Sequence, residues 1–386
     1  MPEAQAPWIT REEFLERQEA CRQRVRDSQL DGLIAVGGPF YDRPGNLAYL
    51  TGHYPPFPSV NFDGEHRGLG FGIFILPAAG TSVLVLDTTA YREEFITADE
   101  LRPAKNLPAA ARQALDDMGL ATGKLAFAGA QVAPWALVQE LSGGLSLELV
   151  PADEIVLALR RRKSGAEIAL LREAAQVAEV GMAAALAEIA PGRSEAQVAA
   201  RGIAAGMTAG ADFVRYLRVL SGPYSGWQHR WPPASERILN EGETVCLDYI
   251  GAVRGYQFDI LRPAIVGEGD AEARTLLEVT AEATEAAIAA CGPGVSIREV
   301  VAAADRVLQR ASLLDHRARF TGHGIGLETV EAPLVMAESD DTLQVGDVIC
   351  LEPGVLIRGV AGARYEYEVA VTTGGCEVLA RPEGWQ

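Results

Sequence analysis

Two similar stretches of sequence decide the fold of this chain: GETVCLD at residues 242–248 and GDVICLE at residues 346–352. In each stretch a glycine and an acidic residue precede an apolar run, and the run ends on a carboxylate, Asp248 or Glu352. An apolar run that follows a turn is typical of a buried strand. The sequence therefore predicts two equivalent strands that each end on an acid.

A second pair of matching stretches precedes the first pair. PGRSEAQV at residues 191–198 matches PGVSIREV at residues 293–300. In each copy Pro-Gly ends one helix, and a serine followed three residues later by Gln or Glu begins the next helix with a capping box. Two matches in the same order and at nearly the same offset favour a tandem repeat of about a hundred residues. We expect the two halves to pack about a pseudo-twofold axis.

A second acid follows each of the two predicted strands. Asp259 lies in YQFDI (residues 256–260), and Glu366 lies in RYEYEV (residues 364–369). If the halves pack about a twofold axis, these acids converge with Asp248 and Glu352. Four buried carboxylates repel one another unless cations neutralise them. A pair of divalent metal ions bridged by carboxylates would neutralise this repulsion, so the sequence predicts a dinuclear metal centre.

His323 completes this set. It lies in TGHGIG (residues 321–326), where glycines on both sides leave the imidazole room to approach a metal. The run lacks the G-x-G-x-x-G spacing of a dinucleotide loop and the lysine of a P-loop. A histidine in a plain turn is the alternative, but the four acids make metal ligation the better interpretation.

The first part of the chain has the pattern of an α/β unit. Apolar runs at residues 33–36, 71–76, 82–87 and 124–128 predict strands, and residues 109–118 predict a helix. The basic run at residues 160–163 then leads into a long alanine-rich helix, predicted over residues 167–190. The predicted fold class is therefore α/β (α+β), with one domain at residues 1–157 and a second at residues 158–386.

Composition excludes several classes of protein. The chain has 386 residues with 52 acidic and 34 basic side chains, hence a net charge of −18, which disfavours a nucleic-acid partner. No apolar stretch approaches the roughly 18 residues of a membrane span. Five dispersed cysteines without a C-x-x-C motif favour a reducing compartment, and residues 1–10 lack the apolar core of a signal peptide. We expect a cytoplasmic protein without nucleic-acid or membrane partners.

At the five candidate ligands the sequence resembles the pita-bread metallohydrolases: Xaa-Pro dipeptidases (prolidases), aminopeptidase P, methionine aminopeptidase and creatinase. All five ligand positions are filled in order, Glu352 is followed by Pro353 and Gly354, and NLAYLTG at residues 46–52 matches the N-terminal domain. The resemblance implies a creatinase/prolidase-type α/β domain followed by a pita-bread domain with a pseudo-twofold repeat. It also implies an Xaa-Pro peptidase activity.

The resemblance assigns a role to each metal ligand. Asp248 would chelate one ion, His323 and Glu352 would bind the other, and Asp259 and Glu366 would bridge the two. The implied cofactor is two divalent ions, with manganese favoured and cobalt, iron or zinc also compatible, because such a site accepts several metals.

The resemblance also points to residues that act on the substrate. Glu352 is the candidate to carry a proton to the leaving nitrogen. His229 falls where the family places a catalytic and substrate-binding histidine near the scissile carbonyl, although a loop histidine packed between Trp227 and Trp231 is the alternative. Arg364 could bind a substrate carboxylate bidentately, or it could form a structural salt bridge with a neighbouring acid.

One departure from the family pattern bears on the substrate. The family's peptidases carry a second histidine seven residues after the ligand histidine, and Val330 occupies that position here. Valine donates no hydrogen bond, and losing one such donor costs about 10²–10³ in rate.

Three interpretations follow: an Xaa-Pro peptidase, a non-peptidase relative, or a binding module without catalysis. The non-peptidase relative would be a creatinase-like or ectoine-hydrolase-like amidohydrolase, or a dimethylsulfoniopropionate lyase. The peptidase is favoured, with a small peptide or a small amide as substrate.

The resemblance further implies a homodimer in which a loop of one subunit reaches toward the active site of its partner. The segment at residues 52–70, rich in Pro, Gly and aromatic residues and containing His53 and His66, is the candidate loop. A plain surface loop is the alternative.

Overall fold

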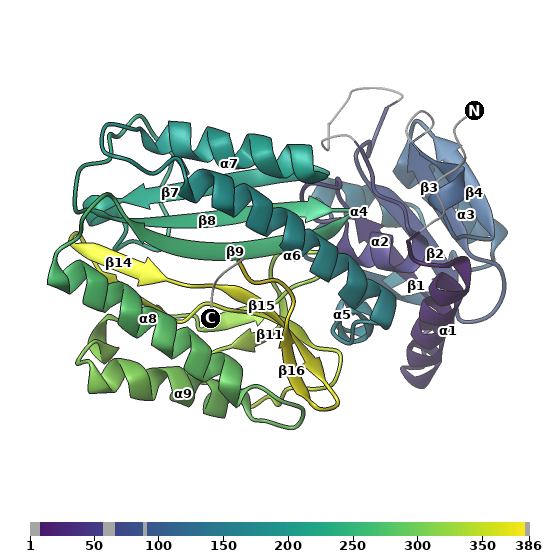
Figure 1. The fold of residues 1–386 in the computed structure, drawn as a ribbon. Coiled ribbons are helices and arrows are strands. Elements are labelled where there is room, and N and C mark those ends of the chain that lie inside the picture. The colour runs from purple at the N-terminus through teal and green to yellow at the C-terminus, as the bar shows by residue number, and fades with distance from the viewer. Residues whose placement is uncertain (1–7, 57–65, 88–90, 383–386) are drawn as a thin grey trace. The chain divides into compact units, whose positions relative to one another are not determined.

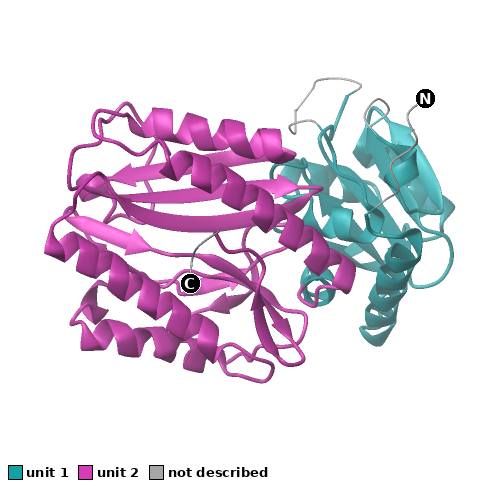
Figure 2. Ribbon diagram, in the orientation of Figure 1, with its two compact units in different colours: residues 1–160 teal, residues 161–386 magenta. Residues whose placement is uncertain are grey.

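The computed structural model describes residues 8–56, 66–87 and 91–382, and the chain divides into two compact units, residues 1–160 and 161–386 (Figure 2). Each unit has its own sheets and its own core. Nine residues of the candidate loop at 52–70, residues 57–65, lie outside the described part of the chain. No helix in the described ranges is long and apolar enough to cross a membrane.

The first unit is a six-stranded mixed sheet with the strand order β4-β3-β2-β1-β5-β6. Its strands are β1 (Gly32–Gly37), β2 (Gly72–Pro77), β3 (Val83–Asp87), β4 (Glu100–Ala104), β5 (Lys124–Ala128) and β6 (Glu148–Pro151). Its helices are α1 (Arg11–Asp27), α2 (Gly45–Thr51), α3 (Leu107–Asp117), α4 (Trp135–Ser142) and α5 (Glu154–Arg160). The central strand β1 pairs with β2 in the antiparallel and with β5 in the parallel direction.

Helices cover both faces of this sheet. Helices α1, α2 and α5 contact one another, while α3 packs with α4 and with β2, β3 and β4. Ile34 and Val36 of β1 share a core with Leu107 and Leu115 of α3. The next residues along β1 point to the other face, which explains why this strand is buried throughout.

The second unit contains two helix pairs and the strands that they cover. The helices are α6 (Gly165–Leu186), α7 (Glu195–Ala209), α8 (Ala271–Ala290) and α9 (Ile297–Arg310). The strands are β7 (Phe213–Ser221), β8 (Thr244–Val253), β9 (Tyr256–Ile265), β10 (Gly322–Gly324), β11 (Glu331–Val335), β12 (Val348–Leu351), β13 (Gly354–Ile357), β14 (Ala361–Arg364), β15 (Tyr367–Thr372) and β16 (Gly375–Val378). They form sheets of order β7-β8-β9, β13-β14 and β11-β10-β12-β15-β16.

The predicted repeat is visible in how these elements pack. Helices α6 and α7 pack on β7, β8 and β9, and helices α8 and α9 pack on strands of the second half (Figure 1). The first copy begins α7 with a capping box, in which Gln197 N–H donates to Ser194 Oγ at 3.2 Å and Ser194 N–H donates to Gln197 Oε1 at 2.9 Å. In the second copy Ser296 N–H donates to the Glu299 carboxylate at 3.3 Å.

Close packing of helices against β8 fixes the strand that carries Asp248. The ring of Tyr249 is fully buried, and its hydroxyl donates to the Gly202 carbonyl of α7 at 3.2 Å. A Cβ atom on Gly206 would lie only 1.9 Å from Tyr249 Oη, and one on Gly181 would lie 2.4 Å from the ring. Glycine at these positions therefore allows both helices to approach the strand.

We expect Gly206→Ala to destabilise the protein by about 1–3 kcal/mol, as overpacking does. In an exposed helix the same change from glycine to alanine would stabilise the protein by about 1 kcal/mol. The sign of the change in the free energy of unfolding therefore distinguishes the two situations. Urea unfolding measures it, with Gly165→Ala as the control because its Cβ would meet no atom within 4 Å. Tyr249→Phe should recover part of the loss, and an unchanged stability of Gly206→Ala would refute the packing argument.

Candidate metal centre

Two of the predicted ligands lie side by side on the β8–β9 hairpin. Asp259 of β9 pairs with Ile250 of β8, and Asp248 pairs with Leu261. Because alternate residues of a strand share a face, Asp248 and Asp259 are diagonal neighbours on one face. Both are almost fully buried, with exposed fractions of 6% and 5%.

Of the other three predicted ligands, His323 lies in the five-stranded sheet, and Glu352 and Glu366 directly flank its strands β12 and β15. His323 of β10 lies opposite Cys350 of β12, and Cys350 lies opposite Glu368 of β15. Glu352 is two residues beyond Cys350, and Glu366 is two residues before Glu368, so both belong to this same face. Glu366 is joined to β9 by its backbone N–H, which donates to the Leu261 carbonyl at 3.0 Å.

These two faces bring the five predicted side chains together. Asp248, Asp259 and Glu366 offer oxygen atoms within 4.8 Å of one another. The His323 Nε2 atom lies 3.7 Å from Asp259 Oδ2 and 3.8 Å from both Glu352 Oε1 and Glu366 Oε1. A second group with donor atoms within 4.8 Å consists of His323, Cys350 and Glu366, so Glu366 is common to both groups.

Without bound cations, repulsion among the carboxylates of this cluster destabilises the folded protein. Burial, followed by the charges of Glu366 and Asp248, raises the pKa of Asp259 well above its usual value. Burial, followed by the charges of Glu352 and Asp248, does the same to the pKa of Glu366. Carboxyl groups this close to one another cannot all ionise without counter-charges.

The donor set fits divalent metal ions. Asp248 Oδ1 and Glu366 Oε1 are buried and accept no hydrogen bond from any residue that the structure describes. The His323 Nδ1 atom lies 3.0 Å from the Gly324 carbonyl, which fits a tautomer with the proton on Nδ1 and a free lone pair on Nε2. Carboxylate oxygens with one oriented imidazole are a common donor set for such ions.

Two arginines hold the outer carboxylates of the cluster. Arg218 of β7 forms a salt bridge with Asp248 Oδ2, and Arg364 of β14 donates to Glu352 Oε2 at 2.7 Å. Both guanidiniums are buried, and in each the Nε atom has no hydrogen-bond partner among the described residues. The salt bridge of Arg364 is the neighbouring-acid alternative that the sequence left open.

Arg218 was missed by the sequence analysis. The signal that could have found it is an arginine within the apolar run Leu217-Arg218-Val219-Leu220, where a buried charge requires a partner. Its partner follows only from the strand register, in which Arg218 pairs with Asp248.

His229 is exposed on the loop after β7 and lies near both arginines. Partial burial of the imidazole, followed by the charges of Arg218 and Arg364, lowers the pKa of His229. The flanking Trp231 side chain is 88% exposed, so the loop does not enclose His229 between two buried tryptophans. Val330 is 55% exposed and supplies no hydrogen-bond donor from its side chain.

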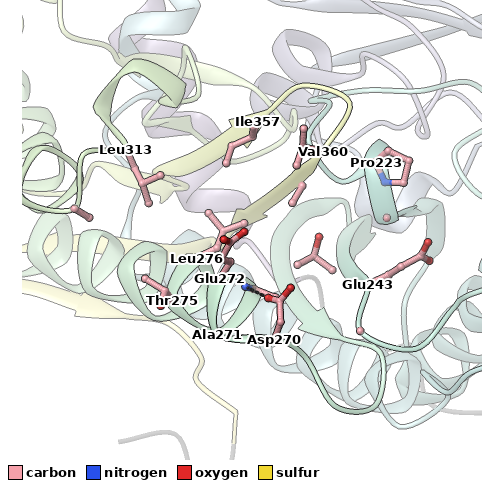
Figure 3. A pocket seen from close by; sticks show the side chains of 16 residues that line it. Pro223, Glu243, Asp270, Ala271, Glu272, Thr275, Leu276, Leu313, Ile357 and Val360 are labelled. Carbon is pink, nitrogen blue, oxygen red and sulfur yellow. Dashed lines mark hydrogen bonds between the residues drawn. The ribbon is translucent and has the colours of Figure 1, made fainter.

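A cavity of about 600 Å³ in the second unit lies apart from this cluster (Figure 3). None of the five predicted ligands lines it. Two of its three carboxylates already have structural partners, because Glu243 binds Arg237 and Asp270 accepts the Ala273 N–H of α8 at 2.7 Å. The cavity is therefore not part of the candidate metal centre.

Comparisons with known proteins identify the two units. The model of metallopeptidase family M24 matches residues 169–373, and that of the creatinase/prolidase N-terminal domain matches residues 17–162. A probable dipeptidase, PepE, of Mycobacterium tuberculosis H37Rv is 32% identical over 78% of this chain and 81% of its own length. The Xaa-Pro dipeptidase of Pyrococcus horikoshii is 26% identical over 80% of this chain and 88% of its own.

Solved structures agree with these matches. The prolidase from Pyrococcus horikoshii superposes with a TM-score of 0.82 at 23% identity, over 95% of this chain and 99% of that one. The dipeptidase PepE from Mycobacterium ulcerans gives a TM-score of 0.79 at 28% identity, over 96% and 97% of the two chains. The predicted fold class and family are confirmed. The chain belongs to metallopeptidase family M24, the metal-dependent peptide hydrolases of the pita-bread fold, and carries the creatinase/prolidase N-terminal domain.

Proposed function

We propose that this metallopeptidase hydrolyses Xaa-Pro dipeptides with two divalent ions held by Asp248, Asp259, His323, Glu352 and Glu366. The observation that carries the proposal is the convergence of these five buried side chains, with His323 Nε2 within 3.8 Å of three carboxylates. The relatives named Xaa-Pro dipeptidase support the substrate class.

The ligands divide into two positions. Asp248 would hold one ion, His323 and Glu352 would hold the other, and Asp259 and Glu366 would contribute to both positions. When bound, two divalent ions polarise the scissile carbonyl and make water nucleophilic near neutral pH. Manganese, cobalt, iron or zinc suits such a donor set, with manganese preferred by the carboxylates.

The protein's own residues position the substrate and move the proton. Glu352 accepts the proton of the attacking water and passes it to the leaving nitrogen. Arg364 keeps the Glu352 carboxylate in place through its Oε2 atom, and the guanidinium would also pair with a substrate carboxylate. His229 donates a hydrogen bond to the substrate carbonyl, and its lowered pKa favours the neutral form of the imidazole.

The test is metal analysis of the purified protein together with hydrolysis of Xaa-Pro dipeptides, an Xaa-Pro tripeptide, creatine and ectoine. About two ions per chain with cleavage of the dipeptides is the expected result. Two ions with turnover of creatine or ectoine alone would overturn the peptidase proposal, and Val330 would then explain the loss of peptide cleavage. No bound metal after supply of manganese or cobalt would overturn the metal centre itself.

His229→Gln is expected to lower kcat for an Xaa-Pro dipeptide about 10²-fold, as the loss of one preorganised donor does. Metal content should stay at two ions because His229 is not one of the ligands. The control is His316→Gln, an exposed histidine of the same unit, which should behave as the parent protein. Steady-state kinetics with fully loaded proteins measures the effect, and an unchanged kcat would remove His229 from the active site.

We also expect a cytoplasmic homodimer. The candidate loop at residues 52–70 would then lie near the partner's active site. Sedimentation equilibrium tests the dimer, and a monomer at all concentrations would exclude it.

A further inference from the structure

Cys350 lies inside the candidate metal centre but has no role in the mechanism above. Its Sγ atom, an imidazole nitrogen of His323 and an oxygen of Glu366 are within 4.8 Å of one another. The strand register places Cys350 directly opposite His323, and the side chain is fully buried. Its thiol makes a long contact of 3.8 Å with the Asp259 carbonyl, which is too weak to account for its position.

The distances suit a shared ion. Bonds of about 2.0–2.3 Å from nitrogen and sulfur to a tetrahedral ion place the donor atoms roughly 3.3–3.8 Å apart. Since the three donor atoms are at most 4.8 Å apart, they need to approach one another by no more than about 1–1.5 Å. Glu366 Oε1, with no hydrogen-bond partner in the described part of the chain, is a buried acceptor beside this position.

The two groups of donors differ in chemistry. Asp248, Asp259 and Glu366 present only carboxylate oxygens, which suit manganese and magnesium. His323, Cys350 and Glu366 present nitrogen, sulfur and oxygen, and a thiolate with an imidazole favours zinc, cobalt or ferrous iron.

We propose that Cys350 is a thiolate ligand of the ion on the His323 side, so that the two metal positions select different metals. This inference rests on the proposed dinuclear centre. On binding, the thiol releases its proton to solvent and the sulfur donates an electron pair to the ion. The expected composition is a softer metal on the His323 side and manganese on the Asp248 side.

The repeat supplies a matched control. Cys246 occupies the equivalent place in the first copy, two residues before Asp248, and is also buried. Its Sγ atom instead donates to the Gly362 carbonyl at 3.4 Å, and Cys246 belongs to neither group of donors. Serine in place of either cysteine keeps the size and hydrogen bonding while removing the sulfur.

The test is a titration of the metal-free full-length protein with cobalt(II), followed by absorption spectroscopy. We expect a near-ultraviolet sulfur-to-cobalt charge-transfer band in the parent protein and in Cys246→Ser. In Cys350→Ser the band should be absent while the visible cobalt absorption remains. Competition with a chromophoric chelator should show zinc affinity at least about tenfold lower in Cys350→Ser, with manganese binding unchanged.

The spectrum of the parent protein alone shows whether sulfur is a ligand. A variant that fails to fold therefore does not affect this conclusion. Two bound cobalt ions without a charge-transfer band would overturn the inference and leave the proposed function standing. Retention of the band in Cys350→Ser would also overturn it. Failure of the parent protein to bind cobalt or zinc would overturn both this inference and the proposed dinuclear centre.

Discussion

Glu366→Gln is expected to remove both metal ions and to lower kcat/KM by about 10³-fold or more, as loss of an essential member of a catalytic unit does. The structure gives the reason, because Glu366 is the one carboxylate shared by both groups of donor atoms. Glutamine keeps the shape of the side chain but presents a neutral amide, which is a weaker ligand than a carboxylate.

The same substitution should stabilise the metal-free protein. Burial, followed by the charges of Glu352 and Asp248, opposes ionisation of Glu366, and a neutral glutamine avoids both costs. Metal content is measured by elemental analysis and stability by thermal unfolding in a chelator.

Asp305→Asn is the control, since Asp305 is a partly buried acid in the same unit that pairs with Arg317 and lies outside the cluster. It should keep both metals and full activity. A Glu366→Gln protein with two tightly bound ions would refute the shared position of Glu366.

The repeat and the acids that converge in the cluster were predictable because they are encoded locally. The predicted strand at residues 124–128 coincides with β5, and the acids Asp248 and Glu352 come directly from the matching stretches. The long helix α6 ends at Leu186, four residues earlier than predicted.

The edge strands could not be predicted from the same signals. Strands β4 and β6 lie at the two edges of the first sheet, where half-exposed residues and the prolines Pro103 and Pro151 replace an apolar run. Proline is tolerated there because an edge strand leaves one side of its ladder unpaired.

Three partners of the cluster depend on contacts between strands distant in sequence. Arg218 meets Asp248 across β7 and β8, whereas Cys350 and Glu368 are brought to His323 by β12 and β15. No local sequence pattern predicts these contacts. The sequence therefore predicted the five side chains that converge in the cluster but missed the groups that contact them.

Glu368 makes the stability of the metal-free protein depend on pH. Its side chain accepts the Asp259 N–H at 2.9 Å through one oxygen, and the other oxygen is buried without a hydrogen-bond partner in the described residues. Burial raises the pKa of Glu368 from 4.5 to about 8.

A carboxyl whose pKa is higher in the folded state than in the unfolded state binds its proton more tightly when folded. The contribution of such a carboxyl to stability is complete below the pKa that it has in the unfolded state. It is lost as the pH rises through the pKa that it has in the folded state. We therefore expect the free energy of unfolding of the metal-free protein to fall by roughly 5 kcal/mol between about pH 4.5 and 8 from Glu368 alone. The raised pKa values of Asp259 and Glu366 act in the same direction.

Bound metal ions should remove the part of this dependence that comes from Asp259 and Glu366, because cations neutralise the carboxylates that otherwise repel one another. Urea unfolding in chelator and in saturating metal, at several pH values, measures both curves. Glu368→Gln keeps the acceptor for the Asp259 N–H and should flatten the curve of the metal-free protein, whereas Glu278→Gln, an exposed acid of α8, should not. A metal-free protein whose stability rises with pH would contradict the assignment, since ionised carboxylates would then be favoured by the fold without any counter-ion.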